Sequence, residues 1–255
     1  MRTAALRSQV AASVDLPVRL LPHLARIFEP LDSLGSMPRP VVAMLREAGI
    51  SRKNRVLDLA CGKGAVAIAV ARGLGCVVHG VDAFAPFVEA AERAADRRGV
   101  AATCLFRIGD VGLWERRRVR VRYDGAMMLG LYPCDRAARV LRRWVRPGGV
   151  YIIDDAFEGN GMAGGVGELP TLDECRSAIE RRGDRIEQEF VPTAAQMAQL
   201  NAGLYARLRG ACAELEAERP RLRADLREFL SRQRAANRLL NGPVRSAVWL
   251  VRRAK

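Results

Sequence analysis

Long apolar runs are missing from this sequence. Arg, Asp or Gly interrupts every apolar stretch before it approaches the roughly 20 residues of a membrane-spanning helix, so we expect a soluble protein with no membrane span. Residues 1–28 are poor in acids and contain arginine, as transit peptides do, but they lack the apolar run of a secretory signal. Leu16, Leu20, Leu21 and Leu24 recur there at helical spacing, which favours an amphipathic cap helix in a cytoplasmic protein.

Lysine is nearly missing as well. Of the 42 basic residues only Lys53, Lys63 and Lys255 are lysine, and alanine is abundant. This skew is typical of a GC-rich coding bias, which raises the arginine content whatever the function. The net charge of +14 also fits a nucleic-acid or acidic partner, which we keep as the less favoured interpretation.

Closely spaced cysteine pairs are also lacking. No CxxC pair occurs, so local spacing predicts no zinc site, and we expect no bound metal. Several cysteines lie in apolar segments, where a reduced thiol behaves as a small hydrophobic side chain. A reducing compartment without a disulfide framework fits this pattern. The six cysteines are Cys61, Cys76, Cys104, Cys134, Cys175 and Cys212.

Short β-like runs do alternate with helical stretches along most of the chain. Strands that alternate with helices predict a parallel sheet covered on both faces, so we expect a doubly wound α/β fold. Arg146-Pro147-Gly148-Gly149 predicts a turn, and residues 159–167 predict a glycine-rich loop. The expected strands are 55–59, 76–81, 102–108, 123–129, 150–154, 185–191 and 244–251, and the expected helices are 41–48, 65–72, 86–97, 136–144 and 172–182.

The chain divides into four parts by pattern. We expect an N-terminal helical cap at 1–50, a core at 51–192, a helical insertion at 193–240 and a final core strand at 241–255. The insertion carries two apolar stripes that must be buried somewhere. We expect it to form, together with the N-terminal helix, a lid over the substrate pocket with Met197, Tyr205 or Phe229 directed inward. Packing on the sheet or a homodimer face is the alternative.

A glycine turn follows the first expected strand and opens a helix. Gly62 and Gly64 let the backbone approach a ligand closely, and Asp82 ends the next strand where a carboxylate can bind both ribose hydroxyls. Gly62-x-Gly64-x-x-Ala67 also fits a dinucleotide site. Asp58, however, would repel a pyrophosphate and suits the amino group of a cationic ligand. Asp110 offers a carboxylate to an adenine amino group.

At these residues the sequence resembles the class I S-adenosylmethionine-dependent methyltransferases. The resemblance implies a Rossmann-like, seven-stranded, mostly parallel sheet of order 3-2-1-4-5-7-6 with its last strand antiparallel, and S-adenosylmethionine as cofactor. The similar segments are Val56-Leu57-Asp58-Leu59-Ala60-Cys61-Gly62-Lys63-Gly64, Val78-His79-Gly80-Val81-Asp82, Phe106-Arg107-Ile108-Gly109-Asp110-Val111, Tyr123-Asp124-Gly125-Ala126-Met127-Met128 and Val145-Arg146-Pro147-Gly148-Gly149-Val150. The cofactor residues it implies are Asp58, Ala60, Gly62, Gly64, Asp82, Ala83, Asp110, Val111, Leu129 and Gly130.

The catalytic residues stay open at this stage. A sulfonium methyl is already activated, so a base is needed only when the acceptor must lose a proton. Tyr132, His23 and Asp154 are the candidates, each with a structural role as its alternative, and Cys134 is either a thiolate or an inert cysteine. Members of the family that methylate amino groups of adenine or glutamine carry Asn-Pro-Pro-Tyr where this chain has Leu129-Gly130-Leu131-Tyr132-Pro133.

The expected lid decides between the possible acceptors. A closed pocket excludes water and polymers, so we expect methyl transfer to a small-molecule metabolite. An RNA or other nucleic-acid methyltransferase would instead need a contiguous basic groove that leads to the site. A protein that binds the nucleoside without turnover is the third possibility.

Overall fold

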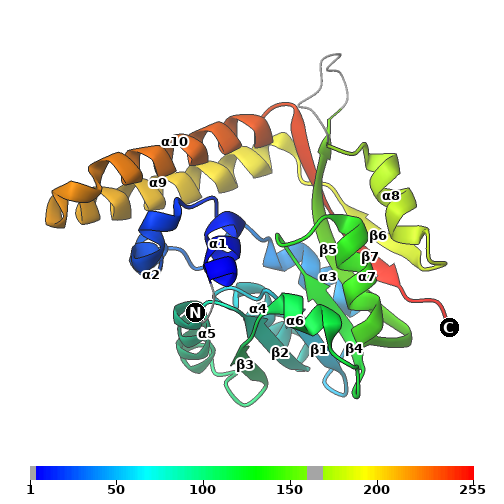
Figure 1. The fold of residues 1–255 in the computed structure, drawn as a ribbon. Helices are drawn as coiled ribbons and strands as arrows, with labels where there is room; N and C mark the ends of the chain where they lie inside the picture. Colours follow the sequence, from blue (N-terminus) through cyan, green and yellow to red (C-terminus); the bar gives the residue numbers. More distant parts are fainter. Residues whose placement is uncertain (1–3, 160–168) are drawn as a thin grey trace.

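Seven strands form one sheet in the order β3-β2-β1-β4-β5-β7-β6 in the computed structural model, which describes residues 4–159 and 169–255 (Figure 1). Strand β7 runs antiparallel to β5 and β6, and the other neighbouring pairs are parallel. This arrangement confirms the topology that the resemblance implied. The strands are β1 (Arg55–Leu59), β2 (Val77–Asp82), β3 (Cys104–Ile108), β4 (Tyr123–Met128), β5 (Val145–Glu158), β6 (Arg185–Phe190) and β7 (Val244–Arg252).

Helices cover both faces of the sheet. Apolar side chains of α3, α4 and α5 are buried on one face, and those of α6, α7 and α8 on the other. The periodicity of α7 shows why: Ala137, Leu141 and Trp144 are buried against the sheet, while Arg136 and Arg139 lie on the exposed side. The helices of the two faces are α3 (Pro38–Glu47), α4 (Ala65–Leu74), α5 (Ala85–Arg97), α6 (Val111–Arg116), α7 (Cys134–Trp144) and α8 (Leu172–Glu180).

A third helical layer lies beyond the sheet. Helices α9 and α10 form a long antiparallel pair, and the N-terminal helices lie between this pair and the end of α5 (Figure 1). Phe28 holds the layer together, because its ring lies 6.0 Å from that of Phe229 and 6.2 Å from that of Phe87. The elements are α1 (Ala4–Ser13), η1 (Val18–His23), α2 (Leu24–Ile27), α9 (Ala194–Glu218), η2 (Pro220–Leu222) and α10 (Arg223–Leu240).

Two local features differ from the sequence-based expectation. The segment around Gly148 is not a separate turn, because β5 begins at Val145 and takes in Gly148 (φ +71°) beside a register shift against β4. Helix α6 was not expected from the sequence, and Asp110 caps it. The expected glycine-rich loop at 159–167 lies outside the described residues except at Gly159. None of the helices in the described part of the chain is long and apolar enough to cross a membrane.

Candidate active site

The loop between β1 and α4 lies at the carboxyl end of the central strands. Gly62 and Gly64 have φ values of +53° and +76°, which glycine adopts without a steric penalty. Ala60 has a φ of +63° despite its side chain, a conformation that costs free energy and occurs most often at functional sites. The tight loop thus ends at the N-terminus of α4, with little side-chain bulk to keep a ligand from its backbone.

Asp82, at the end of β2, is tied to this loop. Its Oδ2 accepts a hydrogen bond from the Gly62 amide at 2.8 Å, and its Oδ1 accepts one from the Phe84 amide at 2.9 Å. Burial raises the pKa of Asp82, and these backbone hydrogen bonds oppose the increase. Each carboxylate oxygen can accept a further hydrogen bond. Asp82 can therefore keep its hydrogen bonds to the backbone and also accept hydrogen bonds from the two hydroxyl groups of a diol ligand.

Asp58 is the most strongly perturbed acid near the loop. Its residue is only 3% exposed, and burial, followed by repulsion from Asp82, raises its pKa to about 8. A buried carboxylate of this kind is neutral at pH 7 unless a cation compensates its charge. Asp58 is therefore placed to ionise when a cationic ligand enters.

The ends of β4 and β5 are joined through Asp154. Its Oδ1 accepts a hydrogen bond from the Gly130 amide at 2.7 Å, and Gly130 has a φ of +71°. Burial is the largest cause that raises the pKa of Asp154 to about 6, against the lowering effect of the Gly130 hydrogen bond. Asp154 thus fixes the Leu129-Gly130 turn at the same edge of the sheet as Asp58.

Asp110 lies just after the end of β3, at the same edge of the sheet. It is the N-cap of α6 and accepts a hydrogen bond from the Gly112 amide at 2.8 Å through Oδ1. Val111 follows as the first, buried residue of that helix. The capping bond fixes the orientation of the Asp110 carboxyl group just after the end of β3.

The three catalytic candidates lie in different surroundings. The Tyr132 ring already faces a cation, because the Arg136 guanidinium lies 3.7 Å from its centroid. Asp154 lies at the strand ends, as described. His23 lies apart from them, near the Arg219–Pro220 turn between α9 and α10, where burial and then Arg219 and Arg221 lower its pKa. The structure does not bring His23 together with the other two.

Lys63 is a site residue that the sequence analysis missed. Its Nζ donates hydrogen bonds to the carbonyl oxygens of Phe28, Glu29 and Leu31 at 3.2, 3.0 and 2.5 Å. Lys63 therefore fastens the N-terminal segment over the glycine loop, and a Cβ on Gly62 would meet Leu34 Cδ1 at 2.9 Å.

The inward direction expected for the insertion is wrong for Phe229 and stays a prediction for Met197 and Tyr205. Phe229 is completely buried against the N-terminal helices and does not face a pocket, which corrects that expectation. Tyr205 accepts a hydrogen bond from Arg234 of α10 at 2.9 Å. Met197 reaches the sheet, where its Sδ lies 3.8 Å from Ser246 Oγ on β7. A helical stripe shows which side chains are buried, but not which partner buries them.

A cluster of sulfur and oxygen ligands lies close by, contributed by Cys134, Asp155 and Cys175. Their side-chain donor atoms lie within 4.8 Å of one another, although no sequence spacing indicated it. Asp155 Oδ2 accepts a hydrogen bond from the Cys134 amide at 2.7 Å. The hydrogen bond to Cys175 and burial raise the pKa of the Cys134 thiol, which opposes the thiolate that a metal ion requires.

Comparison with known proteins finds one protein family whose model matches part of this chain. Residues 56–149 match the family model described as a methyltransferase domain. No curated protein sequence matches the chain. The matched segment contains the glycine loop, Asp82, Asp110 and the Leu129-Gly130 turn.

Solved structures share the fold at low sequence identity. YjhP from E. coli has a TM-score of 0.74 and 17% identity over 91% of this chain and 98% of its own. A SAM-dependent methyltransferase from Thiobacillus denitrificans, crystallised with S-adenosyl-L-homocysteine, has a TM-score of 0.73 and 20% identity over 89% and 96%. A SAM-dependent methyltransferase from Geobacter sulfurreducens, crystallised with the same ligand, has a TM-score of 0.71 and 18% identity over 85% of this chain and 91% of its own.

The family match and the sheet topology agree with each other. Residues 56–149 resemble a methyltransferase domain, and the whole sheet has the fold of the class I S-adenosylmethionine-dependent methyltransferases.

Proposed function

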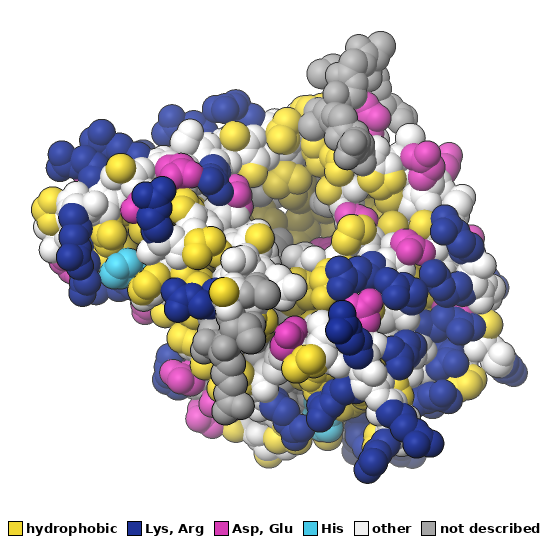
Figure 2. Space-filling model, viewed as in Figure 1, with side chains coloured by type: hydrophobic (Ala, Val, Ile, Leu, Met, Phe, Trp, Pro, Cys, Tyr) yellow, Lys and Arg dark blue, Asp and Glu magenta, His cyan; other side chains and the backbone are white. Residues whose placement is uncertain are grey.

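We propose that this chain transfers the methyl group of S-adenosylmethionine to a small-molecule acceptor held under the helical layer. The observation that carries the proposal is the clamp of Lys63 on the segment Phe28–Leu31, which fixes the N-terminal helices over the glycine loop. Those helices pack in turn against α9 and α10. Figure 2 shows the surface hollowed between this helical pair and the sheet, with hydrophobic side chains around the hollow.

The proposed cofactor position follows the strand ends. Asp82, with Ala83 beside it, binds the ribose, and Asp110 with Val111 binds the adenine. The loop residues Ala60, Gly62 and Gly64 approach the nucleoside through their backbone. The ammonium group of the methionine end lies near Asp58, whose buried carboxyl group a cation would stabilise in its ionised form. Leu129 and Gly130 complete this end.

The chemistry then depends mainly on placement. The acceptor must approach the methyl carbon in line with its bond to sulfur, and orientation of this kind is worth roughly 7–11 kcal/mol in favourable systems. Asp154 acts as a positioning residue, because its hydrogen bond to the Gly130 amide sets the turn at the methionine end. The helical layer keeps water from the reacting atoms.

An RNA acceptor is the second candidate. The specific observation in its favour is the row of exposed arginines on α7, which begins with Arg136 over Tyr132 and continues with Arg139 and Arg143. Such a row could contact successive phosphates.

A methyl-transfer assay separates the two candidates. The protein is incubated with methyl-labelled S-adenosylmethionine and either a metabolite extract below about 1 kDa or total RNA, and the label is followed. The proposal expects label in the small-molecule fraction. Label in RNA alone would support the second candidate, and label in neither, with cofactor binding intact, would indicate a protein that binds without turnover.

A further inference from the structure

Seven arginines surround one cavity at the far end of α7. The cavity has a volume of about 420 Å³, within the range of sites for small ligands. Figure 2 shows the dark-blue side chains gathered over the α6 and α7 side of the molecule. The cavity is lined by Arg118, Val119, Arg122, Arg139, Arg142, Arg143, Arg182 and Arg253.

These arginines come from separate parts of the chain. Arg118 and Arg122 lie between α6 and β4, Arg182 follows α8, and Arg253 follows β7; the others belong to α7. An arginine-rich composition alone does not make distant segments converge on one cavity. The convergence is therefore a property of the fold.

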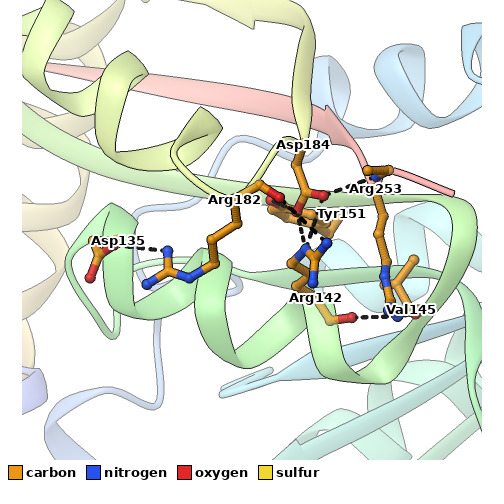
Figure 3. Close-up of polar contacts among 8 residues, drawn as sticks. Asp135, Arg142, Val145, Tyr151, Arg182, Asp184 and Arg253 are labelled. Atoms are coloured by element: carbon orange, nitrogen blue, oxygen red, sulfur yellow. Dashed lines mark hydrogen bonds and ion pairs between the residues drawn. The ribbon is translucent and has the colours of Figure 1, made fainter.

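The floor of the cavity is fixed by a buried acid. Asp184 has a completely buried side chain and accepts hydrogen bonds from Arg142 Nε at 3.0 Å through both oxygens. It also accepts one from the Tyr151 hydroxyl at 2.9 Å (Figure 3). Arg182 is held in a similar way by Asp135 at 3.0 Å. Guanidinium groups held in this manner lose little further freedom when a ligand binds.

Arg253 carries a buried polar atom that is not satisfied. Its Nη1 donates to the carbonyl oxygens of Arg142 and Val145, as Figure 3 shows. Its Nε, however, is buried without a hydrogen-bond partner among the described residues. Burial, followed by repulsion from Arg142 and Arg122, lowers the pKa of Arg253. The protein thus concentrates positive charge here at a cost in free energy.

Too few acids face the cavity to neutralise it. In the described part of the chain, only Asp184, Asp135 and Glu115 form ion pairs with the lining arginines. Arg118 and Arg122 are exposed and form no ion pair with any described residue. Guanidinium groups bind phosphate oxygens in a bidentate manner, so a polyphosphate would supply the missing charge.

We propose that this cavity binds a compact ligand with two or more linked phosphate groups, such as a nucleoside polyphosphate or inorganic polyphosphate. The arginines converge on one volume, and Val119 is the one lining residue that is not arginine. A single-stranded nucleic acid would also need aromatic side chains for base stacking. The site lies towards the Trp144 end of α7, where Arg142 and Arg143 are about 12–14 Å along the helix from Cys134. It is therefore separate from the cofactor site proposed at the strand ends.

Inorganic tripolyphosphate is the probe, titrated into the full chain by calorimetry in about 0.15 M salt. The double variant R118Q/R122Q removes two exposed arginines that anchor no other described element. R207Q/R209Q removes two exposed arginines of α9 and serves as the control with equal charge change. We expect the first pair to raise the dissociation constant at least tenfold and the control to change it less than twofold. Affinity for S-adenosylhomocysteine should stay unchanged in both.

Further ligands separate the sources of the phosphate groups. If ATP displaces bound tripolyphosphate, the site is assigned to nucleoside polyphosphates. If tripolyphosphate binds and ATP does not displace it, the site is assigned to inorganic polyphosphate. Three results would overturn the proposal: no binding of tripolyphosphate or ATP, equal weakening in both double variants, or binding of an RNA oligonucleotide that tripolyphosphate does not displace.

Discussion

The protonation state of single acids at the carboxyl edge of the sheet determines how well a cationic ligand can bind there. Asp58 is the clearest case. Its carboxyl group is buried beside Asp82, and its pKa of about 8 leaves it protonated at neutral pH in the absence of ligand. A nearby ammonium group favours the ionised form and lowers this pKa. If the cofactor places its ammonium group beside Asp58, as proposed, its binding must release a proton from this residue.

This release predicts a pH dependence of affinity. Below pH 8 the proton must leave before the ion pair forms, so the affinity for S-adenosylhomocysteine should rise between pH 6 and pH 8, by at most about tenfold per unit. Calorimetry in buffers of different ionisation enthalpy measures the released proton directly. D58N should bind more weakly and lose the pH slope. An affinity that stays constant over this range in the unmodified protein would contradict the assignment of Asp58.

Asp82 gives the second prediction at this scale. D82A removes the acceptor that we propose for the ribose and also frees the amides of Gly62 and Phe84. Charged hydrogen bonds are worth roughly 1.5–3 kcal/mol each, so affinity for S-adenosylhomocysteine should fall at least tenfold. D96A, at an exposed acid of α5, should bind normally. Normal binding by D82A, with an unchanged circular dichroism spectrum, would mean that the ribose site lies elsewhere.

Among the elements, the N-terminal helices depend on a contact that is distant in sequence. Lys63 belongs to the glycine loop and yet donates hydrogen bonds to three carbonyl oxygens in the segment that follows α2. This lysine therefore couples the glycine loop to the helical layer. A ligand that orders the loop should also order residues 24–34.

K63M tests that coupling. Loss of the charged hydrogen bonds should cost about 1–3 kcal/mol, which lowers Tm by about 2–4 °C per kcal/mol in a chain of this size. Hydrogen exchange at residues 24–34 should become faster, and bound S-adenosylhomocysteine should dissociate faster. K53M replaces an exposed lysine and is the matched control. Unchanged exchange in K63M would show that the segment stays in place without Lys63.

Over the whole molecule, local sequence patterns predict the sheet but not every site. The alternation of strands and helices was enough to expect a parallel sheet covered on both faces, because each signal lies within a short stretch of chain. The strand order was implied only by the family resemblance of the segments that contain Asp58, Gly62 and Asp82. The approach of Cys134 to Cys175 and the arginine cavity could not be expected, since they join residues from distant segments. The burial of its stripe was predicted for Phe229, but its packing against the N-terminal helices in place of a pocket was not.

The central claim is that the carboxyl edge of this sheet binds S-adenosylmethionine. Calorimetric titration of the full chain with S-adenosylhomocysteine and, separately, with NAD tests it most directly. We predict binding of S-adenosylhomocysteine at one site per chain, weakened by D82A but not by R118Q/R122Q, and no binding of NAD. Binding of NAD without any response to S-adenosylhomocysteine would contradict it.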